Sequence, residues 1–298
     1  MEPSPDGERA VSGTARGSLQ VLVATCFYAG VAPVAKLVEL DAAVITFWRA
    51  AFGAFSLALF LVLRGGQFRV RRSDLASLFW MGLLMAGNWY FFLLSAKLST
   101  VAIAVVCLFT YPLITALIEP WYFPESRRVS ELAGGALVVL GCVLLVDRFT
   151  LTSSAAQGAL TGIASALCLS FRNLLNRRAV ARYSSSTLTF YQFVVATILF
   201  VPALLSGSGW PSAGDLPLLF LIGGVLTTFS HVLFTASLAQ LSASRASLLL
   251  SLQPIFAVLL AALLLGEIPS ARIWIGGALI LLAALLPHAT RSLAKSRA

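Results

Sequence analysis

Long stretches with few charged residues recur along the whole chain and constrain its fold more than any other feature. They run over 18–37, 42–63, 74–96, 99–118, 130–147, 156–178, 186–206, 215–237, 242–264 and 271–288. The length of each stretch is close to the roughly 20 apolar residues that a helix needs to cross the core of a bilayer. An isolated strand would leave its backbone groups unpaired in lipid, so these stretches must be helices. The sequence therefore predicts an all-α integral membrane protein with ten transmembrane helices.

The composition leaves little room for a soluble domain. Of 298 residues, 59% are hydrophobic and 11% are charged, against about a quarter charged in a soluble protein. The net charge of +9 raises the question of nucleic acid. The basic residues, however, stand singly or in small groups between apolar stretches, as the positive-inside rule predicts. We therefore expect the lipid bilayer as a partner, and no nucleic acid.

The distribution of Lys and Arg predicts the orientation of the helices. With the N-terminus in the cytoplasm, fourteen basic residues fall on the inner side: Arg9, Arg16, Arg64, Arg69, Arg71, Arg72, Arg127, Arg128, Arg177, Arg178, Arg182, Arg291, Lys295 and Arg297. Four fall on the outer side: Lys36, Lys97, Arg148 and Arg272. Cytoplasmic loops are the ones enriched in basic residues. We therefore expect the N-terminal tail (1–17), which shows no cleavable signal, and the C-terminal tail (289–298) to lie on the inner side of the cytoplasmic membrane.

An internal repeat divides the chain into two halves, 18–148 and 149–288. The features that recur at an offset of 142 or 143 residues are 96–99 with 239–242, Pro112 with Pro254, Glu125 with Glu267, and the Gly-Gly-Ala-Leu runs 134–137 with 276–279. Each half holds five helices, an odd number, so the second half must enter the membrane upside down. The loop charges agree, because four arginines follow the second helix and none follows its counterpart, the seventh.

This ordered pattern resembles the drug/metabolite transporter superfamily, and in particular its EamA-type members with two repeats and ten helices. The elements that carry the resemblance are a Leu-Ser ending, an apolar helix with a central proline, a glutamate and the Gly-Gly-Ala-Leu run, each present twice. Among these proteins the chain looks most like the YddG-type exporters of aromatic amino acids. The resemblance implies a central cavity that opens alternately to the two sides, with the helices at 130–147 and 271–288 at the periphery.

The two matched prolines indicate where a substrate would bind. Inverted repeats commonly place their site near the midplane, where helices are distorted. Pro112 and Pro254 lie near the middle of their helices and remove a backbone hydrogen bond there. We interpret them as structured kinks that line the cavity, and we expect the preceding residues, Tyr111 and Gln253, to bind substrate. The alternative is a tolerated kink whose freed backbone groups find hydrogen-bond partners on neighbouring helices.

Polar side chains inside the spans add further candidates. Asn88 and His231 match at an offset of 143, and polar groups in membrane helices usually face inward. Asn88 begins the run Asn88-Trp89-Tyr90, which suits a site that stacks against a ring and donates hydrogen bonds to it. An interhelical hydrogen bond is the alternative for Asn88. A structural histidine is the alternative for His231, which could also couple transport to protons.

The arginines inside the spans differ in their depth in the membrane. Arg49 lies seven residues into its span, roughly 10 Å deep at 1.5 Å per residue, and could bind a substrate carboxylate in a bidentate manner. Outward snorkelling or pairing is the alternative for Arg49. Arg172 and Arg245 lie within about two turns of the inner surface, and we expect them to snorkel toward it.

Transport of a small molecule is the function that these features favour. An enzyme acting on lipid would need a cluster of acids or histidines at the membrane surface, but the acids are scattered singly, so no catalytic residue, metal ligand or cofactor is expected. The four cysteines lie in apolar stretches without metal-ligand spacing. We expect export of amino acids, aromatic or other neutral ones, by alternating access. No carboxylate stands clearly at the midplane, which favours facilitated diffusion. The alternative is export of drugs or other small metabolites, coupled to protons. The protein could act as a monomer.

Overall fold

A computed structural model describes most of the chain, and every regular element in the part that it describes is helical. The described residues are 5–35, 37–66, 68–99, 104, 107–124, 129–144, 153–206, 210–256, 259–260, 275–276, 278–283 and 286. Five segments within these ranges are long and apolar enough to cross a membrane. The chain is thus an all-α membrane protein, as the sequence predicts.

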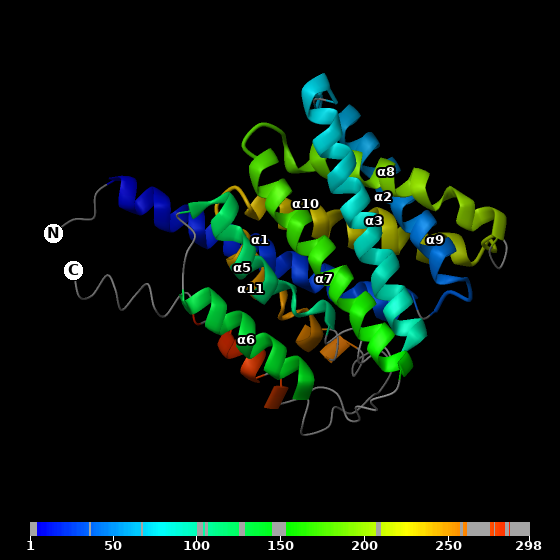
Figure 1. The fold of residues 1–298 in the computed structure, drawn as a ribbon. Helices are drawn as coiled ribbons and strands as arrows, with labels where there is room; N and C mark the ends of the chain where they lie inside the picture. Colours follow the sequence, from blue (N-terminus) through cyan, green and yellow to red (C-terminus); the bar gives the residue numbers. More distant parts are fainter. Residues whose placement is uncertain are drawn as a thin grey trace.

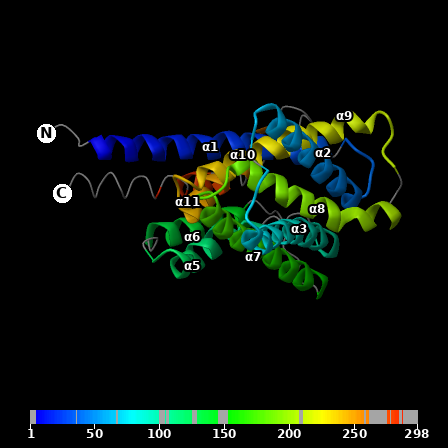
Figure 2. The ribbon, with the colours of Figure 1, turned by 90° about the horizontal axis from the view of Figure 1, so that it is seen from above.

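The helices follow the predicted spans closely. They are α1 (Pro5–Ala35), α2 (Ala42–Leu63), η1 (Arg72–Asp74), α3 (Leu75–Leu98), α5 (Tyr111–Tyr122), α6 (Val129–Leu144), α7 (Ser153–Ala179), α8 (Ser185–Ser206), α9 (Asp215–Phe220), η3 (Leu221–Thr227), α10 (Thr228–Ser237) and α11 (Ala243–Leu250) (Figure 1). Helix α1 begins at Pro5 instead of at 18, so part of the predicted N-terminal tail is helical, and this end projects beyond the other helices (Figure 2). Much of the predicted spans 242–264 and 271–288 lies outside the described residues.

Apolar side chains cover the outer faces of these helices, because lipid replaces water around them. On α2, Phe55, Leu59 and Leu63 are 60%, 48% and 75% exposed. Exposure of this kind on a soluble protein would mark an interaction surface. Polar side chains are buried instead, which places the interactions that need them inside the bundle.

The packing pairs show the symmetry of the two repeats. Helix α1 packs on α10, α3 on α7, α2 on α8, and α5 on α11. If each helix of the first half is exchanged for its counterpart in the second, the α1–α10 pair becomes the α7–α3 pair. The α2–α8 pair maps onto itself. By the offset of 142 residues, α5 corresponds to 253–264 and α11 to 101–108, so it is the pair of whole spans containing α5 and α11 that maps onto itself. The described parts of the two repeats are therefore interlocked, and an internal surface receives side chains from both.

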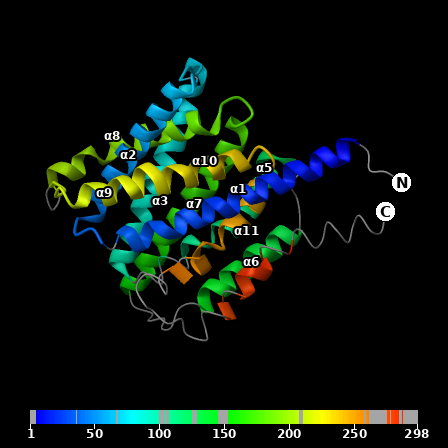
Figure 3. The ribbon, with the colours of Figure 1, turned by 180° about the vertical axis from the view of Figure 1, so that it is seen from behind.

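Counterpart helices run in opposite directions. Gly17, near the start of the apolar part of α1, packs against Gln240 and Leu241, which follow α10 at the end of the bundle where α7 terminates. Helix α1 therefore starts at the end where its counterpart α7 stops. We call this the arginine-rich end, since Arg177 and Arg178 of α7 and Arg71 and Arg72 at η1 lie there. Helix α6 lies at one edge of the bundle beside the segment at 276–283 (Figures 1 and 3).

A two-residue turn precedes each of the matched prolines. Residues 109–110 form a turn, and α5 starts beside it with Pro112 in its first turn. Residues 251–252 form the equivalent turn after α11, and the chain is helical again from 253 to 256. Pro is well tolerated at the start of a helix, where its missing N–H would have no helical partner. Each span is thus a helix interrupted by a turn near its middle.

A π-helical segment, η3, joins α9 to α10. Gly223 lies in this segment, and a Cβ added to it would come within 2.5 Å of the carbonyl oxygen of Arg49. The missing side chain lets α2 approach closely. The Thr228 hydroxyl donates to the carbonyl of Gly223 at 2.8 Å. π-Helical turns are common at functional sites, and this one brings Thr227 against Arg49.

Candidate substrate-binding site

Aromatic rings from three other helices surround His231 of α10. The ring centroids of Tyr28 (α1), Phe193 (α8) and Trp89 (α3) lie 5.0, 5.5 and 5.8 Å from that of His231, and all three rings are edge-on to it or nearly so. Phe193 is fully buried and His231 almost so. Edge-to-face contacts at these distances are favourable. The rings form a compact aromatic wall with members from both repeats.

Arg172 of α7 supplies a buried guanidinium to the same cluster. Its side chain is only 1% exposed. The Nε atom donates to Oε1 of Gln192 at 2.6 Å, and Nη2 lies 2.9 Å from Nδ1 of His231. The expectation that Arg172 snorkels to the surface is therefore wrong. The reason is that α7 turns this residue toward α8 and α10, where two side chains accept its hydrogen bonds.

The contact with Arg172 also determines the state of His231. A guanidinium can only donate hydrogen bonds, so Nδ1 of His231 must be the acceptor. The ring is then neutral and carries its proton on Nε2. That atom is buried without a hydrogen-bond partner among the described residues. A donor of this kind is costly to bury unpaired, and a substrate oxygen would satisfy it.

Arg49 of α2 reaches the cluster from the opposite side. Its Nε donates to the hydroxyl of Thr227 at 2.6 Å, and its Cζ lies 4.3 Å from the centroid of the Trp89 ring. Trp89 in turn packs against His231, which Arg172 contacts. The two guanidinium groups therefore border the same small cluster of rings.

No carboxylate of the described residues neutralises these two cations. The ion pairs in this part of the chain are Glu119–Arg177, Asp74–Arg182 and Glu131–Arg245. All three lie at the arginine-rich end, away from the cluster. A buried charge without a partner is strongly unfavourable. An anionic group on a ligand would provide the missing partner.

Several of the predicted site residues come together here and others do not. Arg49, Trp89 and His231 belong to the cluster. Asn88 faces α7 instead, where its Nδ2 donates to the backbone oxygen and the hydroxyl of Ser165 at 3.1 and 2.9 Å. It makes the interhelical hydrogen bond that the sequence left open. Tyr90 is 52% exposed and packs against Phe91, so it lies outside the cluster.

The residues beside the two prolines lie in a different part of the bundle. The Tyr111 hydroxyl donates to the carbonyl of Ser247 at 2.9 Å, and Tyr111 is almost fully buried. It thereby joins α5 to α11 across the repeats. Gln253 and Pro254 are half-buried. Tyr111 also belongs to the large apolar cluster against which Tyr28 packs.

Sequence reasoning missed four members of the cluster. Tyr28, Phe193 and Gln192 carry no distinguishing signal in the sequence, because single aromatic or amide residues in apolar spans usually serve packing, and Arg172 was expected to snorkel. The one available signal was polar spacing, since Arg172 and Asn176 lie one turn apart on α7, and Gln192 faces them from α8. Such a signal is weak without knowledge of which helices are neighbours.

A network of charged residues connects the repeats at the arginine-rich end. The carboxylate of Glu119 (α5) is fully buried and accepts hydrogen bonds from the backbone N–H groups of Ala243 and Ser244 at 2.6 and 3.0 Å. It also accepts from the Ser244 hydroxyl and pairs with Arg177 at 2.7 Å. Glu119 therefore caps the N-terminus of α11, where a negative charge is favoured.

The neighbouring pair corrects a second expectation. Nε of Arg245 lies 3.2 Å from Oε1 of Glu131 (α6), and Arg245 is only 6% exposed. Arg245 was expected to snorkel, but its position three residues after the N-cap Ser242 turns it toward α6, where the carboxylate lies. This second pair also joins the first half of the chain to the second.

Comparison with known proteins identifies the family of the chain. The model of the EamA-like transporter family matches residues 15–147 and again 156–287. The chain belongs to the EamA-like transporter family. The two matches correspond to the two halves of the internal repeat. Membership makes the protein a transporter and not an enzyme, in agreement with the sequence analysis.

Two curated relatives of the chain are exporters by name. The threonine/homoserine exporter RhtA of Escherichia coli (strain K12) is 28% identical over 229 residues, which are 75% of this chain and 74% of RhtA. The pseudopaline exporter CntI of Pseudomonas aeruginosa (strain UCBPP-PA14) is 25% identical over 254 residues, 85% of this chain and 88% of CntI. A solved crystal structure superposes with a TM-score of 0.81 at 20% identity, covering 95% of this chain and 99% of that one, and it supports the fold.

Proposed function

We propose that the protein exports amino acids and related metabolites that carry a carboxylate, and that the cluster around His231 binds them. The observation that carries this proposal is the presence of two guanidinium groups, from Arg49 and Arg172, without a carboxylate partner among the described residues. Arginine binds carboxylates strongly and with defined geometry. The relatives RhtA and CntI, both exporters by name, support the direction of transport.

In this proposal each part of the cluster has its own role. Arg49 and Arg172 bind the carboxylate, and the free Nε2–H of His231 donates to one of its oxygens. The aromatic faces of Tyr28 and Phe193 receive the side chain of the substrate, which favours aromatic or other neutral amino acids. A ring on the substrate would gain edge-to-face contacts of the kind that the wall already makes.

The cycle is proposed to be alternating access between the inverted repeats without proton coupling. His231 is held neutral by Arg172, and the buried carboxylates Glu119 and Glu131 are engaged in ion pairs far from the cluster. The proposal places the protein in the cytoplasmic membrane with both termini inside, because basic residues concentrate at the arginine-rich end.

Counterflow into proteoliposomes that contain only this protein tests the proposal. Each amino acid is compared with its amide and its decarboxylated amine, which keep the side chain but lack the carboxylate. We expect the acid to exchange and both analogues to fail, with no effect of a pH gradient. Lack of counterflow for every amino acid would refute the proposal. Equal exchange of acid and amide would instead favour a drug exporter.

A substrate with two carboxylates is a second candidate for the same site. Two cations border one small cluster of rings, so a dianion would neutralise both, whereas one carboxylate leaves a net positive charge. The same counterflow screen separates the candidates. Preference for acidic over neutral amino acids, measured at equal concentration, would favour the dianion.

A further inference from the structure

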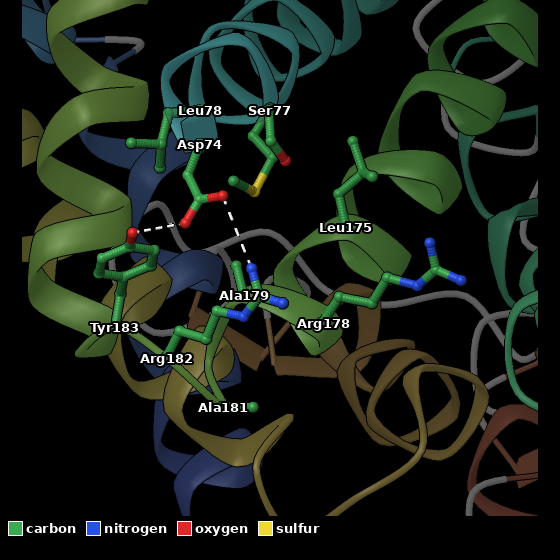
Figure 4. Close-up of a pocket in the computed structure, with 10 residues that line it drawn as sticks. Asp74, Ser77, Leu78, Leu175, Arg178, Ala179, Ala181, Arg182 and Tyr183 are labelled. Carbon is green, nitrogen blue, oxygen red and sulfur yellow. Dashed lines mark hydrogen bonds and ion pairs between the residues drawn. The ribbon is translucent and has the colours of Figure 1, made fainter. Parts of the chain in front are cut away.

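We infer that a cavity at the arginine-rich end is the vestibule through which the substrate reaches the cluster around His231. The cavity has a volume of about 540 Å3 and is lined by η1, α3, α7 and the connection from α7 to α8 (Figure 4). The inference rests on the proposed function and adds a route to it.

The lining of the cavity suits an amphipathic, carboxylate-bearing molecule. Arg178 and Arg182 contribute two cations, and Leu78, Met81 and Leu175 contribute apolar surface. The single acid of the lining, Asp74, is engaged: it accepts a hydrogen bond from the Tyr183 hydroxyl at 2.6 Å and lies 3.6 Å from Nη1 of Arg182 (Figure 4). The lining therefore carries a net positive charge, which attracts a carboxylate from solution.

A chain of buried polar side chains leads from the cluster toward this cavity. Gln192 accepts from Arg172 at 2.6 Å and donates through Nε2 to Oδ1 of Asn176 at 2.9 Å. Asn176 lies one turn before Ala179, and Ala179 lines the cavity. From Arg172 to Ala179 the rise along α7 is roughly 10 Å at 1.5 Å per residue. The polar chain therefore covers most of the depth between the cluster and the cavity.

Several polar atoms on Asn176 and on residues near Arg172 and Gln192 are buried without a hydrogen-bond partner among the described residues. They are Nδ2 of Asn176, both side-chain polar atoms of Asn173, and the hydroxyl of Thr189, on residues that are fully buried. A buried polar atom without a partner costs roughly 1–3 kcal/mol. Packing of α7 against α8 does not require these groups, since apolar residues would fill the space. Water or a passing substrate would satisfy them.

A thin apolar layer separates the cavity from the polar chain. Leu78, Met81 and Leu188 form it and are 2%, 1% and 0% exposed. Leu188 is one turn from Gln192, whose Nε2 also donates to the Leu188 carbonyl at 3.1 Å. Two of these residues also line the cavity directly. Flexible Met and Leu side chains can change rotamer to open such a layer.

Thiol labelling tests whether the route is accessible. Asn176→Cys is compared with Leu174→Cys, an equally buried position that packs in the large apolar cluster on another face of α7. Each protein is placed in lipid nanodiscs, treated with a water-soluble maleimide and analysed peptide by peptide, with the native cysteines as internal references. We expect Asn176→Cys to react at least about tenfold faster, because attack by a thiolate requires access to water. Equal rates would overturn the inference.

A blocking experiment tests whether the substrate uses the route. Met81→Cys in proteoliposomes is coupled to a bulky maleimide, and counterflow is measured before and after coupling. We expect flux to fall at least about tenfold, and the same reagent to leave Leu174→Cys unaffected. Unchanged flux with a complete adduct would overturn the vestibule and leave the proposed function intact.

Failure of the proposed function and failure of the vestibule would give different results. If the unmodified protein transports no amino acid, the proposed function fails, and the labelling ratio alone decides whether the route is accessible to water. If Asn176→Cys does not assemble in the membrane, Thr189→Cys replaces it, since its hydroxyl is also buried and unpaired in the described structure.

Discussion

The guanidinium groups of Arg49 and Arg172 set what the binding site can accept. Each is held in place by a hydrogen bond of 2.6 Å, to Thr227 and Gln192 respectively. Neither residue is free to turn away when no substrate is bound. Such pre-organised donors avoid the ordering cost that a flexible side chain would incur on binding.

Removing either guanidinium should weaken substrate binding. For Arg172→Gln and Arg49→Gln we expect a loss of about 1.5–3 kcal/mol, the usual value for a hydrogen bond to a charged group, or roughly 10- to 100-fold in affinity. The measurement is the half-saturating substrate concentration in counterflow. Arg64→Gln is the control, because Arg64 lies in the turn after α2, and its kinetics should not change.

Arg172 and Arg245 show why the sequence could not predict the whole site. Both lie near the ends of apolar spans, and depth alone favours snorkelling for each. What decides the outcome is the neighbouring helix: α8 offers Gln192 to Arg172, and α6 offers Glu131 to Arg245. Arg49 is a candidate from its depth in its span, and His231 from its match with Asn88 at an offset of 143.

At the scale of the helix, the carboxylate of Glu119 connects three helices, α5, α11 and α7. It joins α5 to the first turn of α11 and to Arg177 of α7. Since α5 belongs to the first repeat and both partners belong to the second, the contact holds the repeats together at the arginine-rich end.

Loss of this charge should destabilise the protein markedly. For Glu119→Gln we expect a drop in unfolding free energy of about 3–5 kcal/mol, because Arg177 and the start of α11 lose a buried partner. Thermal unfolding in detergent gives the measurement. Asp74→Asn is the matched control: its partner Arg182 is 65% exposed, and an exposed pair contributes about 1 kcal/mol or less. Similar shifts for both variants would contradict this ranking.

The interrupted helices should matter for transport more than for stability. Pro112→Ala and Pro254→Ala each restore a backbone N–H that can bond to the carbonyl four residues earlier, which straightens the span. We expect slower counterflow with unchanged or higher melting temperature. Pro202→Ala, inside α8 and exposed at its surface, should leave the flux unchanged. Unaltered flux in both interrupted-helix variants would show that the turns are only structural.

At the scale of the whole molecule, the two repeats are alike in packing but unlike in charge. The described ion pairs lie at the arginine-rich end, and the position equivalent to Glu119 in the second repeat, 142 residues later, is Ala261. The proposed membrane orientation rests on the same asymmetry of basic residues. The fold could be predicted because hydropathy and the internal repeat are properties of the chain itself. The site could be predicted only in part, because it depends on which helices become neighbours.

Both termini should be found on the cytoplasmic side. A protease-cleavable tag at either end should resist protease added to intact cells, and a tag inserted between α8 and α9 should be cut, because basic residues are retained inside. Cleavage of a terminal tag in intact cells would reverse the proposed orientation and assign the vestibule to the outer face.

The π-helical segment between α9 and α10 has a consequence for insertions and deletions. Its hydrogen bonds run from residue i to i+5, so each turn holds about one residue more than a turn of α-helix. Deleting one of its seven residues would let the backbone relax into a regular α-helix and leave the residues on either side facing nearly the same way. The same deletion in the regular helix that follows, between Thr228 and His231, would instead rotate everything after it by roughly 100° about the helix axis. His231 would then leave the aromatic wall, so the π-helical segment tolerates a change of length that its neighbour does not.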